Sequence, residues 1–138
     1  MMDDVILSKK ESVERCVRQI RTYYADAPDR PFEQDFLKQD AIAINIQRAA
    51  ELCIDLANHV VKTLKLGIPK ESRESFLLLA GAGLIGWEMA RNLGRMVGFR
   101  NVLVHDYRDL DVAVMKDIIE NRLNLFVEFT AAVLKIPG

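Results

Sequence analysis

Apolar side chains recur at intervals of three and four along most of the chain, a spacing typical of amphipathic helices. The first such stretch runs from about Asp3 to Ala25. Its apolar positions are Val5, Val13, Cys16, Val17 and Ile20. A longer stretch, from about Phe36 to Leu66, keeps the same period. We expect it to end at Gly67 and Pro69, because glycine and proline commonly follow the last turn of a helix.

Three further helices are predicted in the second half of the chain. A short one should run from Glu71 to Ala80, a long one from Leu84 to about His105, and the last from Val112 to Leu134. Asp109 or Asp111 is expected to cap the last helix, since a carboxylate there accepts hydrogen bonds from free backbone amides. No β-branched run alternates with polar residues, so the sequence favours an all-α bundle of about five helices.

Composition limits the classes of protein that the chain can belong to. Its 138 residues fit one domain spanning residues 1–138. The 19 basic and 20 acidic residues exclude a generally polycationic nucleic-acid binder, so any affinity for phosphate must be local. Cys16 and Cys53 are too few for a disulfide scaffold and fit a reducing compartment. We expect no leader peptide and no membrane segment, and therefore a cytoplasmic protein.

Two glycine motifs allow both a functional and a structural interpretation. The sequence GAGLIG at residues 81–86 matches the dinucleotide-binding fingerprint, with Asp106 about twenty residues later. However, Phe76–Leu79 before it is leucine-rich rather than β-branched, and we interpret the glycines as a joint between two helices. Gly94 and Gly98 indicate close packing against a neighbouring helix, of this chain or of another.

Two patterns resemble metal sites. Glu51, Asp55 and His59 fall four residues apart on one helical face, but a solvated polar face has the same appearance and is the favoured interpretation. The second pattern is similar in outline to the metal-binding residues of HD-type phosphohydrolases, with His59, His105, Asp106 and Asp117 as its members. We retain a metal phosphohydrolase as a less favoured alternative, and we expect no metal and no other cofactor.

Positive charge is concentrated in one window of the sequence. Residues 90–108 contain Arg91, Arg95, Arg100 and Arg108 against Asp106 alone. Four minus one gives a formal charge of +3, in a chain whose net charge is -1. Such a local field can hold a phosphate backbone, although an ordinary charged helix face has the same composition.

The sequence RNVLVHDY at residues 100–107 lies within this window. Arginine matches phosphate oxygens with a planar fork of donors, and histidine can transfer protons near neutral pH. Asn101 and His105 share a helical face, so Asn101 can orient the imidazole. Tyr107 offers a stacking ring or a hydroxyl, unless it is simply a core aromatic. These residue types fit the cleavage of RNA.

The pattern Arg100-x4-His105-x-Tyr107, with Asn101 after the arginine, resembles the signature of HEPN-domain toxins of the HepT type. Two longer stretches extend the resemblance, residues 45–61 (NIQRAAELCIDLANHVV) and residues 67–101 (GIPKESRESFLLLAGAGLIGWEMARNLGRMVGFRN). The resemblance covers nearly the whole chain, and the motif shows no departure from the family pattern.

The resemblance implies a HEPN-like helical bundle that forms a homodimer and places two motifs in one cleft. It also implies a metal-independent endoribonuclease, the toxin of a type VII-like toxin–antitoxin system, with Arg100 and His105 as its catalytic residues. Its partner would be an MNT nucleotidyltransferase antitoxin that neutralises the toxin by transferring AMP to Tyr107.

Two interpretations do not depend on this resemblance. Arg91 and Arg95 are RNA-binding candidates on the basis of charge alone. The alternative to an enzyme is a non-catalytic helical dimer whose motif only docks the nucleotidyltransferase.

Overall fold

The computed structural model describes residues 2–26 and 29–137, and every regular element within them is helical. The helices are α1 (Met2–Ala25), α2 (Phe36–Thr63), α3 (Ser72–Gly81), α4 (Trp87–His105), α5 (Val112–Asn121) and α6 (Leu123–Leu134), with 3₁₀ turns η1 (Phe32–Gln34) and η2 (Tyr107–Asp109). These two ranges contain no strand, so the predicted all-α class is confirmed. None of the helices described is both long and apolar enough to span a membrane.

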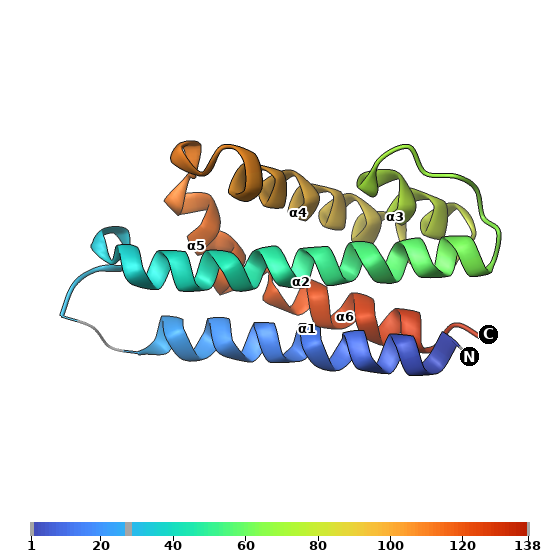
Figure 1. Cartoon of the computed structure of the whole chain (residues 1–138), viewed down its shortest axis with the longest axis horizontal. Coiled ribbons are helices and arrows are strands. Elements are labelled where there is room, and N and C mark those ends of the chain that lie inside the picture. Colours follow the sequence, from blue (N-terminus) through green and yellow to red (C-terminus); the bar gives the residue numbers. More distant parts are fainter. Residues whose placement is uncertain (1, 27–28, 138) are drawn as a thin grey trace.

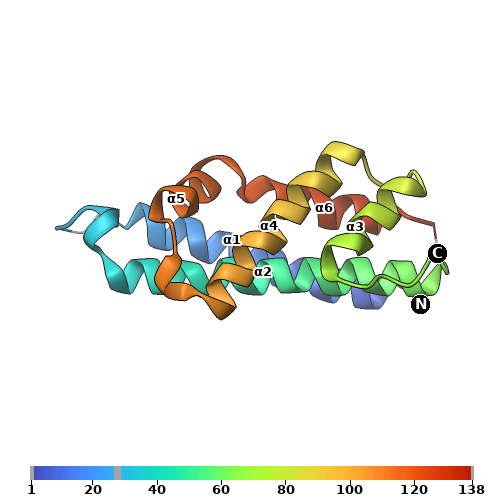
Figure 2. The ribbon, with the colours of Figure 1, turned by 90° about the horizontal axis from the view of Figure 1, so that it is seen from above.

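Two long antiparallel helices, α1 and α2, run the length of the molecule (Figure 1). Helices α3 and α4 cover one side of α2, and α6 packs against α1, α2 and α4. The view from above shows the C-terminal end of α4 crossing α2 (Figure 2). Both chain ends lie at one end of the bundle, whereas α4 ends and η2 begins near the other (Figure 1). The end of α4 is therefore placed beside the first half of α2.

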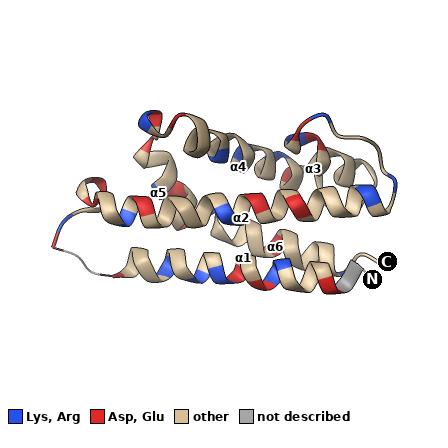
Figure 3. Cartoon of the chain, viewed as in Figure 1, with Lys and Arg blue, Asp and Glu red and all other residues tan. Residues whose placement is uncertain are grey.

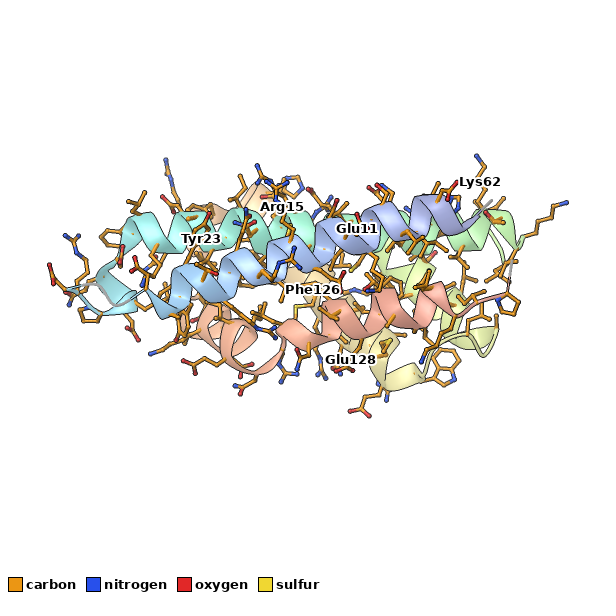
Figure 4. The ribbon with its side chains drawn as sticks, turned by 90° about the horizontal axis from the view of Figure 1, so that it is seen from below. Glu11, Arg15, Tyr23, Lys62, Phe126 and Glu128 are labelled. Atoms are coloured by element: carbon orange, nitrogen blue, oxygen red, sulfur yellow. The ribbon has the colours of Figure 1, made fainter. Side chains whose placement is uncertain are left out.

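Aromatic side chains from α3 and α6 fill the centre of the bundle. The rings of Phe76 and Phe129 meet edge to face, with centroids 5.3 Å apart and an interplanar angle of 79°. Phe126 is fully buried, and Figure 4 shows it facing the middle of the bundle while Glu128 of the same helix lies at the edge. Burial of each such ring contributes roughly 1.5–3 kcal/mol to the free energy of unfolding.

The prediction of one final helix over Val112–Leu134 is wrong, because the chain breaks at Arg122 into α5 and α6. Arg122 has φ −129° and ψ 0°, outside the helical region. The side chains of Asn121 and Arg122 both donate to the carboxylate of Asp117, at 2.8 and 3.0 Å, and stabilise this turn. The break lets α5 follow the end of α4 while α6 packs along α1, giving six α-helices in the described residues instead of about five.

The cap of α5 is Asp111, one of the two residues predicted for this role. Its Oδ1 accepts from the backbone amides of Ala113 and Val114, at 2.9 and 3.4 Å. Asp109 instead ends η2, the short turn that follows the motif. The other predicted helix boundaries differ from the observed ones by up to three residues; the largest differences are at the end of α2 and the start of α4.

The glycines at residues 81–86 form a joint between α3 and α4, as predicted. Gly81 ends α3 and Gly86 caps α4. Gly83 has φ +75°, a conformation that glycine adopts without steric cost. Because helices flank this joint on both sides, the dinucleotide fingerprint has no strand before it and no nucleotide-binding architecture around it.

Gly94 and Gly98 pack against a helix of the same chain. A Cβ added to Gly94 would lie 3.1 Å from Arg73 Cγ, and one added to Gly98 would lie 3.1 Å from Arg73 Nη2. The side chain of Arg73 on α3 thus lies along the surface that the two glycines leave open on α4. The close packing is confirmed, but it joins α3 to α4 and does not itself indicate a second copy of the chain.

Candidate active site

The predicted motif lies where α4 ends. Arg100 and Asn101 are in its last turns, and His105 is its final residue. Asp106, with φ −139° and ψ 47°, leaves the helical region, and its amide donates to Val102 O at 2.9 Å. Tyr107 therefore begins η2 instead of extending α4. Because of this change of direction, Arg100 at the start of the motif and Tyr107 at its end both contact the same neighbouring helix, α2.

Arg100 is held by two side chains. Its Nε donates to Glu51 Oε2 on α2 at 3.3 Å, and its Nη1 donates to Asn101 Oδ1 at 2.9 Å. The side chains of Arg100 and Glu51 are 25% and 38% exposed, so the ion pair lies at the surface and remains open to a ligand. The planar fork is thereby fixed in one orientation next to α2.

Asn101 therefore supports a different residue from the one expected. The sequence places Asn101 and His105 on one helical face and predicts that the amide orients the imidazole. In the structure the side-chain oxygen of Asn101 accepts from Arg100 instead. His105 is exposed at the end of α4, and no side-chain hydrogen bond to it is found among the described residues. Its ring is free to meet a substrate.

Tyr107 faces the start of α2. Its hydroxyl donates a hydrogen bond to Asp40 Oδ1. Partial burial, followed by the hydrogen bond and the negative charge of Asp40, raises the pKa of Tyr107 to about 12. The residue remains 41% exposed, so the interpretation as a core aromatic is wrong. Its hydroxyl lies at a surface that a second protein can approach.

Sequence reasoning missed the acidic residues that meet the motif. Asp40 belongs to no sequence motif, and Glu51 is noted only for its spacing from Asp55 and His59. The two are eleven residues apart, close to three helical turns, and so share one face of α2. That spacing was the available signal, but the partners of the two carboxylates lie 67 and 49 residues further along the chain. Only the packing of α4 on α2 identifies them.

Arg91 and Arg95 do not join Arg100 in one patch. Arg95 precedes Arg100 by five residues, which places the two about 140° apart around α4. Both Arg91 and Arg95 are exposed, and Arg95 Nη1 donates to Asn92 Oδ1 at 3.1 Å. Arg95 lines a hollow between α4 and α5. The concentration of charge seen in the sequence is thus divided between two sides of the helix, and Figure 3 shows basic and acidic residues interspersed over the fold.

The spaced polar residues of α2 do not form a metal site. Glu51 pairs with Arg100, and Asp55 Oδ2 lies 3.7 Å from Lys9 Nζ on α1. Within residues 2–26 and 29–137, no group of three or more histidine, cysteine or acidic side chains is arranged to hold a metal ion. The phosphohydrolase pattern is likewise dispersed, since His59 is on α2, whereas Asp117 is on α5 and accepts a hydrogen bond from Arg122. That alternative loses its geometric basis.

The chain is similar in sequence to two nucleases. The chain is 41% identical over 128 residues to the mRNA nuclease HepT of Shewanella oneidensis, covering 93% of this chain and 95% of that protein. It is 31% identical over 80 residues to the tRNA nuclease HepT of Aphanizomenon flos-aquae, covering 58% and 52% of the two chains.

Solved structures are similar along nearly the whole chain. A tri-AMPylated HEPN toxin of Shewanella oneidensis, solved in complex with an MNT antitoxin, has a TM-score of 0.88 and 40% identity, covering 94% of this chain and 96% of that one. A toxin–antitoxin structure with AMP-PNP also has a TM-score of 0.88, at 39% identity. The family model described as "Ribonuclease HepT-like" matches residues 13–133. The chain belongs to the HepT-like family of HEPN ribonucleases.

Proposed function

We propose that this chain is an endoribonuclease toxin that cleaves RNA without a metal ion, using Arg100 and His105. The observation that carries the proposal is the placement of Arg100, held by Glu51, and of an exposed His105 at the same open end of α4. The names of the relatives support a nuclease that acts on RNA. Membership in the HepT-like family supports a role as the toxin of a type VII-like toxin–antitoxin system.

The two residues have complementary roles in this mechanism. The 2′-hydroxyl of the RNA attacks the adjacent phosphorus, and the bond from phosphorus to the 5′-oxygen of the next nucleotide breaks. Arg100 binds the non-bridging oxygens through guanidinium donors that Glu51 and Asn101 leave available, and so stabilises the added negative charge. His105 transfers a proton to or from the reacting oxygens. Asn101 acts by holding Arg100.

We also propose that two copies of the chain form the functional unit. Cleavage needs one group to accept the proton of the 2′-hydroxyl and another to donate a proton to the leaving oxygen. One copy supplies a single motif histidine, whereas a homodimer with two motifs in one cleft supplies two. The contact of Gly94 and Gly98 with Arg73 lies within one chain, and we expect the exposed end of α4, which carries His105, to face the second copy.

Tyr107 is the proposed acceptor for AMP from an MNT nucleotidyltransferase antitoxin. The exposed hydroxyl and the solved complexes of similar toxins with this class of antitoxin support the assignment. An added AMP brings one negative charge and an adenine beside Arg100, where it competes with RNA. Free, buried Cys16 and Cys53 fit the reducing cytoplasm in which we expect the pair of proteins to act.

Cleavage of RNA in the presence of EDTA tests the enzymatic role. The wild-type chain should cleave, and His105→Ala should reduce the rate by about 10²–10⁴-fold, the usual contribution of an acid–base group. His59→Ala is a suitable control, since it removes the other histidine, which lies on α2 outside the motif.

Two results would contradict the proposal. Activity that EDTA abolishes would return the metal phosphohydrolase to consideration. Absence of RNA cleavage by the folded wild-type chain would leave the non-catalytic docking dimer as the better description.

A further inference from the structure

Asp40 is the one side chain in the described residues to which the hydroxyl of Tyr107 is hydrogen-bonded. Tyr107 Oη donates to Asp40 Oδ1, although the two residues are separated by 67 positions in the sequence. Asp40 lies in the second turn of α2 and is exposed. It forms no ion pair with any described residue. Its carboxylate is therefore not committed to a cation and directly faces the proton of the hydroxyl.

A tyrosine hydroxyl needs help to become a nucleophile in this setting. With its pKa raised to about 12, Tyr107 keeps its proton at neutral pH. A nucleophile that is weak in its protonated form is commonly activated by a base within hydrogen-bonding distance. A candidate base must also reach the proton that it removes. Asp40 satisfies this geometric requirement before any partner protein is bound.

We propose that Asp40 is the general base for the AMP modification of Tyr107, so that the toxin supplies one catalytic group for its own neutralisation. The inference rests on the proposed modification of Tyr107. Tyr107 Oη attacks the α-phosphorus of ATP held by the nucleotidyltransferase and forms a new oxygen–phosphorus bond. The bond from the α-phosphorus to the oxygen bridging to the β-phosphate breaks, and pyrophosphate leaves. The proton of the hydroxyl passes to Asp40 Oδ1.

Other groups near Tyr107 are less suited to this role. His105 is two residues away and exposed, and no hydrogen bond joins it to Tyr107 in the described chain. Arg108, the next residue, is a cation and cannot accept a proton. Glu51 is already paired with Arg100. Because Asp40 is exposed, it can release the acquired proton to water after each transfer.

Replacing Asp40 by asparagine separates a base from a residue that only holds the ring. Asp40→Asn keeps the size and an acceptor oxygen, so the hydrogen bond from Tyr107 can persist while the base is lost. Asp55→Asn is the matched control, because it makes the same chemical change at an exposed position of the same helix. The full-length chain, an MNT nucleotidyltransferase antitoxin, ATP and Mg²⁺ are mixed, and mass spectrometry follows the first AMP added.

For Asp40→Asn, we expect the rate of transfer at pH 7 to fall by about 10²–10⁴-fold relative to both the wild type and Asp55→Asn. The rate of the variant should rise about tenfold per pH unit above pH 7, because the reaction then depends on hydroxyl groups already ionised by solvent. The wild type should show a shallower rise. Asp40→Glu, which keeps a carboxylate, should regain part of the rate.

Three outcomes would overturn the assignment. If Asp40→Asn is modified within threefold of the wild type, the carboxylate only positions Tyr107. If Asp40→Asn is slow but shows the pH profile of the wild type, and Asp40→Glu is equally slow, the loss reflects altered docking or folding. If His105→Ala alone abolishes transfer, the imidazole is the base. A Tyr107→Phe chain that still acquires AMP would instead contradict the proposed modification itself, whatever the result for Asp40.

Discussion

Arg95 and Arg100 lie five residues apart on α4, yet their surroundings differ in every respect that matters for binding a phosphate. Arg100 turns towards α2, where Glu51 and Asn101 fix its guanidinium at an open surface. Arg95 turns towards α5, and its one side-chain partner in the described residues is Asn92 of its own helix. Two identical side chains on one helix thus differ because only one is held by a second helix.

The sharpest test of this difference is to remove each arginine separately. Arg100→Ala should lower the rate of RNA cleavage by at least about 10²-fold, because it removes the donors that stabilise charge on the phosphate. Arg95→Ala should retain a rate within about twofold at saturating RNA. Cleavage of a labelled RNA by both variants, with circular dichroism to check their helix content, measures the contrast. Similar losses in both variants would mean that the two sides of α4 act as one site.

Removing the negative charge by which α2 holds Arg100 should lower the rate of cleavage less than removing Arg100 itself. Glu51→Gln replaces the ion pair by a neutral hydrogen bond and leaves Arg100 in place. Since a partly exposed ion pair contributes about 1 kcal/mol, we expect kcat/KM for cleavage to fall about fivefold. Asp55→Asn again serves as the control on the same helix. A rise in activity would indicate that Glu51 competes with RNA for Arg100 instead of orienting it.

The smallest expected effect concerns the other side of α4. We keep Arg91 and Arg95 as proposed RNA contacts outside the cleavage site. Arg91→Glu and Arg95→Glu should each reduce the slope of log binding constant against log salt by roughly 0.7, the value for one phosphate of a single strand. Filter binding over a range of salt concentrations gives the slope. A slope identical to that of the wild type in both variants would assign the two arginines to an ordinary solvated face.

Local signals in the sequence predict the elements but not their contacts. The period of apolar residues locates α1 to α4, and the glycines at residues 81–86 are correctly assigned to a joint because no strand pattern precedes them. The break at Arg122 is not predicted, since the apolar period continues across it while side-chain bonds to Asp117 determine where the helix ends. Periodicity describes which face of a helix is buried, and it carries little information on a local change of axis.

The candidate site shows the same limit. Arg100, His105 and Tyr107 can be identified from the sequence because they lie within eight consecutive residues. Asp40 and Glu51 belong to the same surface, but the hydrogen bonds that place them there span 67 and 49 residues. Such contacts arise from the crossing of α4 over α2 and leave no periodic pattern. Counting charges along the sequence likewise groups Arg95 with Arg100. On a helix, however, residues five positions apart point to different sides.

The position of the chain ends has a practical consequence for attaching this protein to other molecules. The start of α1 and the end of α6 lie together at one end of the bundle, and η2, with Tyr107, lies towards the other (Figure 1). A surface tether, fluorescent reporter or purification tag joined at either terminus would leave the opposite end pointing into solution. Immobilised in this way, the toxin should still present its motif to RNA and to a modifying enzyme, and binding of each could be followed on the same sensor.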